Sequence, residues 1–258
     1  MAKIITFANS KGGVAKTTTC LATGCCLAEM GYKVLLIDLD HQANLSDDLG
    51  RGDEDFTITD LFEDPKFDIN KIIYPAMDLK KEIPNLFVIP ADITLAAEAR
   101  SAERFRHRLT ILSDAIKRIE MPFDFILIDA RPAIDLSIEN AFLVTDMTVI
   151  PVDQDKRATK GISDLFDVIK EVKRQDKFKY LVLKTKVDVR NKIMLESTEE
   201  RLKKMKLHVA NTQIGVSEDY KKATDIGRPI TFFANGSKGH VEYMQFTNEL
   251  LEYMNNGA

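Results

Sequence analysis

The feature that most constrains the fold is a series of short, almost wholly apolar runs separated by stretches of helical length. There are seven such runs, the last of them weaker: "KIITFAN" (3–9), "KVLLIDLD" (33–40), "NLFVIPA" (85–91), "FDFILIDA" (123–130), "MTVIPVD" (147–153), "KYLVLKTKVD" (179–188) and "HVANTQIG" (208–215). Runs that are apolar at nearly every position indicate strands buried on both faces. Amphipathic stretches lie between them, at 16–30, 95–120, 135–145, 158–175, 192–206 and 239–256. This alternation predicts an α/β fold with a doubly wound, mostly parallel sheet flanked by helices.

The chain shows no sign of division into separate units. It has no internal repeat and no low-complexity linker, and a length of 258 residues fits one α/β domain. Residues 51–79 are acidic and carry two prolines, which predicts short helices and loops in an excursion from the sheet edge. We therefore expect a single domain over residues 1–258.

Targeting and redox signals are weak. No apolar run approaches the roughly 18 residues of a membrane span, and "MAKIITF" lacks the longer apolar region of a signal peptide. We therefore expect a cytoplasmic protein.

The three cysteines, Cys20, Cys25 and Cys26, fall within seven residues and lack the second half of a metal site. We interpret them as small apolar residues of a buried helix.

The stretch "SKGGVAKTTT" (10–19) joins the first apolar run to the first helical stretch. An ordinary phosphate loop reads G-x-x-x-x-G-K-[ST], and here Ser10 and Ala15 occupy the two glycine positions. The order of strand, glycine pair, Lys-Thr and helix still aims backbone N–H groups and a helix N-terminus at one point, which suits a polyphosphate. We expect Lys16 to reach the β- and γ-phosphates and the Thr17 hydroxyl to ligate Mg²⁺.

Carboxylates end two of the apolar runs. Asp38 and Asp40 close the run at 33–40, and Asp129 closes the core of the run at 123–130. An isolated buried carboxylate is costly, although one such aspartate alone is explained equally well as a helix cap. Phosphoryl transfer needs acidic groups around Mg²⁺ and one group to orient the attacking water. Two strands that end in aspartate, in a chain with a phosphate loop, therefore favour a metal site.

Three segments together resemble the deviant Walker motifs of the ParA/MinD family of ATPases: "KGGVAKTTT", "VLLIDLDHQANLS" and "FDFILIDARPAID". The similarity extends to "VTDMTVIPVDQD" and "IGRPITFFANGSKGHVEYMQFTNELLEYM", and is weakest at 51–84 and about 186–215. The resemblance implies an ATPase that binds ATP with Mg²⁺, dimerises around the nucleotide and hydrolyses ATP to ADP and phosphate.

The resemblance also implies a role for each matching residue. Lys16 serves its own ATP, whereas Lys11 matches the signature lysine that contacts the partner subunit's phosphates. Asp40 positions the hydrolytic water, which makes Lys11, Lys16 and Asp40 the catalytic set. The implied metal set is Thr17, Asp38, Asp40 and Asp129, with Asp38 and Asp129 acting through water and Gln42 alongside. The implied ATP-binding set is Lys11, Gly12, Gly13, Val14, Ala15, Lys16, Thr17 and Thr18, with Thr185 and Asp188 at the start of the base-binding loop.

Three positions depart from the family pattern. Ala15 replaces a usual glycine; if its φ is positive, the alanine costs roughly 1 to 2 kcal/mol, and if it is helical the alanine is harmless. His41 replaces the proline of "DPQ" beside Asp40; it either titrates near neutral pH or is a solvated loop histidine. Arg131 follows Asp129 by two residues and either pairs with a nearby carboxylate or contacts a partner.

Positive charge is concentrated in one region of an acidic chain. Residues 170–206 hold 13 Lys and Arg against 6 Asp and Glu, while the whole chain has a net charge of −4. Such asymmetry marks either a surface that faces nucleic acid or a membrane, or a solvated helix face. With the family resemblance we favour DNA binding, although Asp219 stands near the place of a family arginine. The candidate DNA-binding residues are Arg190, Lys192, Lys203, Lys204, Lys206, Lys221 and Lys222.

Within the family, the chain most resembles the short ParA-type DNA partition ATPases that lack an N-terminal helix-turn-helix, because it begins directly at the first strand. That resemblance implies nonspecific DNA binding in the ATP state and a nucleoid-associated location. It also implies slow hydrolysis, stimulated by a small, ParB-like centromere-binding protein.

Alternative functions remain open. A positioner of a protein cargo on the nucleoid would share the same DNA-binding dimer. A MinD-like membrane-cycling regulator needs a basic amphipathic C-terminal helix, whereas this C-terminus is acidic and Tyr243, Phe246, Leu250 and Met254 predict a core-facing stripe. A metabolic or electron-transfer enzyme like the nitrogenase iron protein would need cysteines after Asp129, and the sequence has none there.

Overall fold

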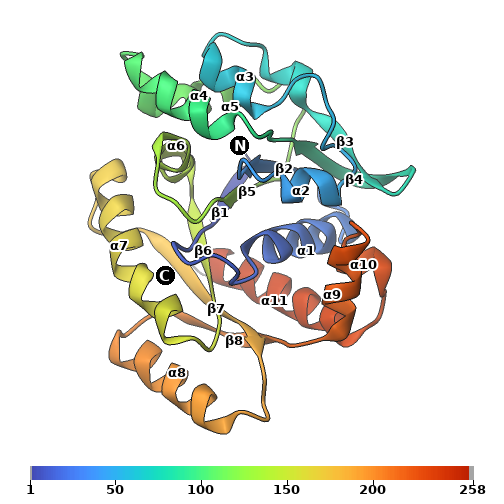
Figure 1. The fold of residues 1–258 in the computed structure, drawn as a ribbon, viewed down its shortest axis with the longest axis vertical. Helices are drawn as coiled ribbons and strands as arrows, with labels where there is room; N and C mark the ends of the chain where they lie inside the picture. Colours follow the sequence, from blue (N-terminus) through green and yellow to red (C-terminus); the bar gives the residue numbers. More distant parts are fainter. Residues whose placement is uncertain (1, 256–258) are drawn as a thin grey trace.

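A computed structural model describes residues 2–255, apart from the side chains of residues 156–158, 160, 221 and 224. Eight strands form one sheet in the order β3-β4-β2-β5-β1-β6-β7-β8 (Figure 1). Only the pair β3–β4 is antiparallel, and every other neighbouring pair is parallel. The strands are β1 (Lys3–Phe7), β2 (Val34–Leu39), β3 (Tyr74–Asp78), β4 (Lys81–Ile89), β5 (Phe125–Ala130), β6 (Met147–Val152), β7 (Lys179–Val187) and β8 (Val209–Gly215). The predicted doubly wound, mostly parallel α/β fold is confirmed.

Helices cover both faces of the sheet (Figure 1). One face carries α1 (Lys16–Glu29), α2 (Asn44–Asp48), α9 (Glu218–Asp225), α10 (Ile230–Phe233) and α11 (Lys238–Asn255). The other carries α3 (Ile58–Glu63), α4 (Leu95–Ser101), α5 (Ile111–Ile116), α6 (Leu136–Val144), α7 (Lys156–Lys173) and α8 (Lys192–Lys204). Short 3₁₀ turns are η1 (Ile69–Ile72), η2 (Ala102–Arg104) and η3 (Arg108–Thr110).

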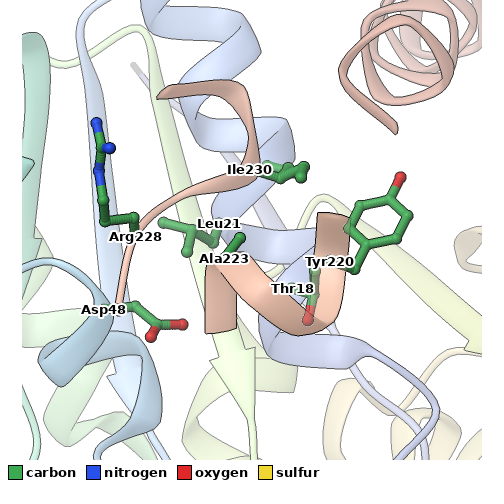
Figure 2. A pocket seen from close by; sticks show the side chains of 8 residues that line it. Thr18, Leu21, Asp48, Tyr220, Ala223, Arg228 and Ile230 are labelled. Carbon is green, nitrogen blue, oxygen red and sulfur yellow. The ribbon is translucent and has the colours of Figure 1, made fainter. Parts of the chain in front are cut away.

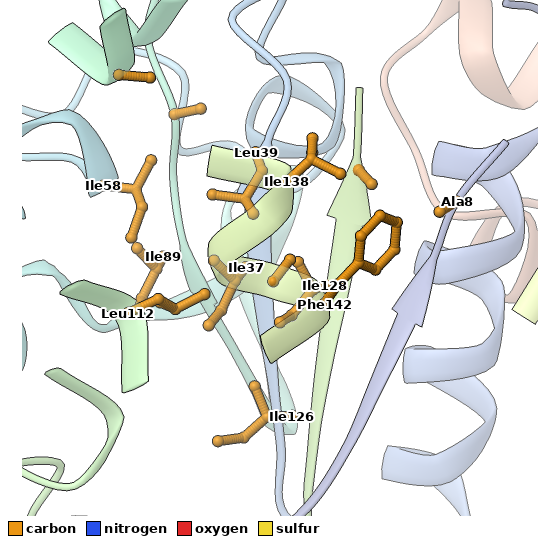
Figure 3. Close-up of a cluster of buried hydrophobic side chains, with 14 of the residues drawn as sticks. Ala8, Ile37, Leu39, Ile58, Ile89, Leu112, Ile126, Ile128, Ile138 and Phe142 are labelled. Atoms are coloured by element: carbon orange, nitrogen blue, oxygen red, sulfur yellow. The ribbon is translucent and has the colours of Figure 1, made fainter. Parts of the chain in front are cut away.

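The apolar runs are buried on both faces because alternate residues enter two separate cores. In β2, all six residues are buried; Leu35, Ile37 and Leu39 enter the core under α3 to α8, and Val34 and Leu36 enter the core under α1 and α11. Figure 3 shows the first of these cores, with Ile37 and Leu39 beside side chains from β5 and α6. The two-sided burial is what a continuous apolar strand predicts.

The edges of the sheet differ from the expectation. The run predicted at 85–91 begins at Lys81, and the segment predicted to hold only helices and loops contributes an antiparallel strand, β3. The edge strand β3 and the start of β4, which pairs with it, each carry a proline and charged residues, and this composition conceals them in the sequence. The helix predicted at 95–120 was wrong in its centre, because Phe105 adopts extended backbone and separates α4 from α5.

Two expectations about helices are confirmed. The three cysteines are free and buried on α1. In α11, Tyr243, Phe246 and Leu250 are buried and Met254 packs against them, so the predicted stripe faces the core. Within residues 2–255, no helix combines the length and apolar character needed to cross a bilayer.

The β8 edge is closed by carboxylates of α11. Glu249 accepts hydrogen bonds from the backbone N–H groups of Asn211 and Thr212, at 2.6 and 2.8 Å. Glu242 accepts one from the N–H of Gly215, at 2.9 Å. These three strand N–H groups are therefore satisfied by side chains and not by a further strand.

The buried stripe of α11 leads to a stability prediction. Phe246→Ala should lower the free energy of unfolding by about 3 to 5 kcal/mol, because it opens a cavity at a fully buried side chain. Val241→Ala is the matched control on the same helix, since Val241 is 46% exposed and should change stability by only about 0.5 kcal/mol. Guanidinium denaturation of both variants measures the difference, and equal losses would contradict the assignment of the stripe.

Candidate functional site

The loop between β1 and α1 is open on its outer side. A Cβ added at Gly12 or Gly13 would meet no atom within 4 Å, so both glycines border free space. Gly13 has φ +74°, a conformation that glycine adopts at little cost. The loop therefore presents bare backbone toward an open cleft at the N-terminus of α1, which is the arrangement expected for an anion.

The backbone conformation of Ala15 decides between the two outcomes expected at this position. Its φ of +63° and ψ of +37° are left-handed, so this position is one at which glycine is favoured. The carbonyl of Ala15 accepts hydrogen bonds from the N–H and the hydroxyl of Thr19, at 2.9 and 2.6 Å, which hold the first turn of α1. The left-handed conformation therefore destabilises the folded protein by roughly 1 to 2 kcal/mol with alanine at this position, relative to glycine.

The two loop lysines are engaged in different ways. Lys16 is 7% exposed, and its Nζ donates to the carbonyl of Lys11 at 3.1 Å. Burial lowers the pKa of Lys16, opposed by the charges of Asp129 and Asp40. The side chain of Lys11 pairs instead with carboxylates that follow β6: its Nζ lies 2.7 Å from Asp153 and 3.3 Å from Asp155.

The aspartates meet at the carboxyl ends of adjacent strands. The parallel register of β2 and β5 sets Asp38 directly beside Asp129. Asp38 is fully buried; its Oδ1 accepts from the N–H of Asp40 at 3.0 Å, and its Oδ2 from the N–H and hydroxyl of Ser46 at 3.1 and 2.8 Å. Burial raises the pKa of Asp38 above its usual range, which these hydrogen bonds partly offset. Asp38 thus fixes the chain that carries Asp40.

Asp129 is the least satisfied of the three carboxylates. It is 1% exposed and hydrogen-bonds to Thr17, yet its Oδ1 is buried without a hydrogen-bond partner among the described residues. Burial, followed by the charge of Asp38, raises the pKa of Asp129 well above its usual range. An orphaned carboxylate oxygen beside a hydroxyl suits a hard cation. The described residues include no cluster of three His, Cys, Asp or Glu that could hold a metal ion unaided.

A cleft of about 820 Å³ extends from this point. One wall is the phosphate loop with Lys16, Thr17 and Thr18, continued by Asp40 and α2 residues. The opposite wall consists of Ile214–Ser217, at the end of β8, together with Tyr220 and Asp225 of α9. Its volume suits a nucleotide-sized ligand. The wall residues from β8 and α9 were not expected to form the site, because no local pattern distinguishes them.

Beside the start of α1, residues of α1 and α9 line a small pocket (Figure 2). Figure 2 shows Thr18 and Leu21 of α1 facing Tyr220 and Ala223 of α9, with Asp48 at one side. Burial, followed by the neighbouring charge of Asp47, raises the pKa of Asp48 to about 6. Thr18 and Tyr220 border both this pocket and the cleft, so α9 links the cleft wall to the helix that follows the phosphate loop.

Residues at the end of β7 brace the phosphate loop. The buried Thr185 hydroxyl donates to the carbonyl of Val14 at 3.0 Å, and Lys186 Nζ donates to the carbonyl of Gly13 at 2.7 Å. Lys186 lines the cleft, whereas Thr185 and Asp188 are not among its described lining residues. Asp188 pairs with Arg190 at 2.8 Å.

The other two residues that depart from the family pattern, His41 and Arg131, each lie beside a carboxylate. His41 Nδ1 lies 3.2 Å from Asp40 Oδ1, and its Nε2 lies 2.9 Å from the amide nitrogen of Gln42. Arg131 pairs with Asp135 at 2.7 Å. Asp135 caps α6 by accepting from backbone N–H groups of its first turn. Of the two readings of Arg131, pairing with a nearby carboxylate is the one found.

The candidate DNA-binding residues do not form one surface. Lys192, Lys203, Lys204 and Lys206 are exposed on or beside α8, and the Arg190 side chain is 85% exposed. Lys222 is exposed on α9, which covers the opposite face of the sheet, and the side chain of Lys221 lies outside the described residues. Three exposed glutamates, Glu196, Glu199 and Glu200, divide the basic residues of α8 into two groups.

The strain at Ala15 leads to a prediction. Ala15→Gly should raise the free energy of unfolding by about 0.5 to 1 kcal/mol, because relief of ~1 to 2 kcal/mol exceeds the ~0.5 to 1 kcal/mol of added unfolded-chain entropy. Ala22→Gly, in the buried middle of the same helix, is the control and should lower it by at least about 1 kcal/mol. Chemical denaturation compares the two, and a destabilised Ala15→Gly protein would refute the strain.

Comparison with known proteins identifies the protein family to which this chain belongs. The chain matches a family model described as an AAA domain over residues 2–182. It is 32% identical to the sporulation initiation inhibitor protein Soj of Bacillus subtilis, over 97% of this chain and 98% of that protein. It is 29% identical to the chromosome partitioning protein ParA of Caulobacter vibrioides, over 96% and 94% of the two chains.

A solved structure shares the fold. Cobyrinic acid a,c-diamide synthase of Mycobacterium smegmatis, with a bound ATP analogue and magnesium, superposes with a TM-score of 0.84 at 23% identity, covering 100% of this chain and 98% of that one. The family model spans most of the chain and the match to Soj extends along nearly all of it. The chain therefore belongs to the ParA/MinD family of deviant Walker A ATPases, together with Soj and ParA.

Proposed function

We propose that this protein is a DNA partition ATPase whose single domain, residues 1–258, binds ATP in the cleft beside the phosphate loop. The observation that carries the proposal is the convergence of Lys16, Thr17, Asp40 and Asp129 at one end of that cleft. Two other proteins support the proposal. The relative named ParA is a chromosome partitioning protein, and the structure with the same fold contains an ATP analogue and magnesium.

The phosphates occupy the open side of the loop. Lys16 leaves the Lys11 carbonyl for the β- and γ-phosphates, and backbone N–H groups of residues 12–18 bind the remaining oxygens. The Thr17 hydroxyl would ligate Mg²⁺, with Asp38 and Asp129 acting through water and Asp40 completing the set of metal-site residues. When bound, Mg²⁺ offsets the negative charge of the phosphates and of the buried carboxylates.

Hydrolysis depends on Asp40 and Lys11. Asp40 lines the cleft, and its position is fixed through the hydrogen bond from its N–H to Asp38. Its carboxylate orients a water whose oxygen bonds to the γ-phosphorus as the bond to the β–γ bridging oxygen breaks. Lys11 leaves Asp153 and Asp155 to stabilise the partner subunit's phosphates, in the manner of an arginine finger supplied in trans.

The nucleotide state controls assembly. ATP favours a homodimer that binds nonspecific DNA through the basic residues of α8, in a salt-dependent way. A small ParB-like, centromere-binding partner stimulates an otherwise slow hydrolysis, and the ADP state releases DNA. The protein is cytoplasmic and associated with the nucleoid. The apolar stripe of α11 is occupied in the core, so that helix offers no support for the membrane-cycling alternative.

The role of Asp40 gives a prediction about assembly. Asp40→Ala should retain ATP affinity, lose most steady-state hydrolysis and accumulate as an ATP-bound dimer, because the attacking water is no longer oriented. Lys16→Ala is the control that should lose ATP binding altogether. Phosphate release and light scattering with ATP–Mg²⁺ measure these properties. Wild-type turnover by Asp40→Ala would remove Asp40 from the mechanism, and unchanged nucleotide affinity in Lys16→Ala would refute the phosphate site.

The DNA proposal is tested by fluorescence anisotropy with an arbitrary duplex, with ATP–Mg²⁺, with ADP–Mg²⁺ and without nucleotide, at two salt concentrations. Binding should be tight only with ATP, and weaker at higher salt. Lys203→Glu with Lys204→Glu should weaken it at least about tenfold. Lys80→Glu with Lys81→Glu makes the same charge change at exposed residues of the far sheet edge and should leave binding unchanged. Equal loss in both pairs would exclude a specific role for α8.

A further inference from the structure

A β-bulge near the end of β7 turns a lysine toward the phosphate loop. Residues 184–187 of β7 lie opposite residues 213–215 of β8, so β7 carries one extra residue there. In a regular strand, consecutive side chains point to opposite faces of the sheet. Here the consecutive side chains of Thr185 and Lys186 both donate hydrogen bonds to carbonyls of the phosphate loop. The bulge therefore directs Lys186 at the loop, as bulges beside functional sites commonly do.

The backbone of Lys186 has a conformation that lysine seldom adopts. Its φ of +51° lies in the left-handed region, where glycine is favoured because it has no Cβ. Any other residue lowers stability there, and such positions persist mainly at functional sites. Glycine would form the same bulge with less strain. What lysine adds at this position is its charged side chain.

That side chain lies in the cleft without an anionic partner. Lys186 lines the cleft, and its Nζ donates to the carbonyl of Gly13 at 2.7 Å. Among the described residues, no carboxylate forms an ion pair with it. Lys16, which the phosphate-loop pattern assigns to phosphates, donates to a loop carbonyl in the same way. An ammonium group binds an anionic oxygen more strongly than a neutral carbonyl, so a phosphate competes well for both lysines.

We propose that Lys186 is a second cation, after Lys16, that this chain supplies to the phosphates of its own nucleotide. Its Nζ leaves the Gly13 carbonyl for a phosphate oxygen when the nucleotide binds. Lys186 is exposed and its stem is flexible, so this exchange needs no movement of β7. The inference rests on the proposed nucleotide site and adds a residue that the phosphate-loop pattern does not contain.

The test is displacement of a fluorescent ATP derivative, with Mg²⁺, by unlabelled ATP and by tripolyphosphate, which has the phosphates but no base. Lys186→Met keeps the apolar stem and removes the charge, so it should weaken both competitors by about tenfold. Lys186→Arg retains a cation and should stay within about threefold of the wild type. Lys177→Met removes the same charge at an exposed residue before β7 and should change neither affinity.

Two further measurements separate contact with phosphate from a purely structural role. The loss in Lys186→Met should shrink at higher salt, because ions screen an exposed charge. Lys186→Gly suits the left-handed backbone, so it should not lower the midpoint of chemical denaturation, yet it should weaken both competitors as Lys186→Met does.

Three results would overturn the inference. They are unchanged affinity for ATP or tripolyphosphate in Lys186→Met, wild-type affinity in Lys186→Gly, and a loss that is the same at both salt concentrations. The last result would leave Lys186 as a brace of the Gly13 carbonyl alone. All three leave the nucleotide site itself intact, whereas a wild-type protein that binds neither ATP nor tripolyphosphate would overturn both proposals.

Discussion

The parallel pairing of β5 with both β1 and β2 is the interaction on which the site depends. Parallel neighbours end at the same edge of a sheet, so this pairing alone brings the phosphate loop, Asp38 and Asp129 together. The same pairing buries two carboxylates and a lysine side by side, which shifts their pKa values away from the ordinary range. Without a ligand this end of the cleft is electrostatically incomplete, a condition that binding relieves.

The centre of the fold was predictable because burial on both faces leaves a continuous apolar signal in the sequence. The phosphate loop and the strand-end aspartates were equally readable, since each lies within a few residues of such a run. The edge strand β3 and the break at Phe105 were not, because prolines and charged residues leave no periodic pattern there. In this protein, local sequence predicts the strands buried on both faces better than the edge strand and the irregular segments that connect helices.

The cleft wall was beyond sequence reasoning for a different reason. Tyr220 and Asp225 reach the site only because α9 packs on α1, and that packing depends on contacts between residues some 200 positions apart. At Ala15 and Arg131 the sequence left two outcomes for each, which only backbone conformation and neighbours could decide. Ala15 is left-handed, and Arg131 pairs within its own chain at the start of α6.

The carboxylates that close β8 limit how copies of this protein can associate. A sheet grows from one molecule into the next only when an edge strand has free N–H and C=O groups to offer. At β8, Glu242 and Glu249 already accept three of those N–H groups. Continuous intermolecular sheets are thereby disfavoured along this edge, because an incoming strand would first have to displace Glu242 and Glu249 from those N–H groups.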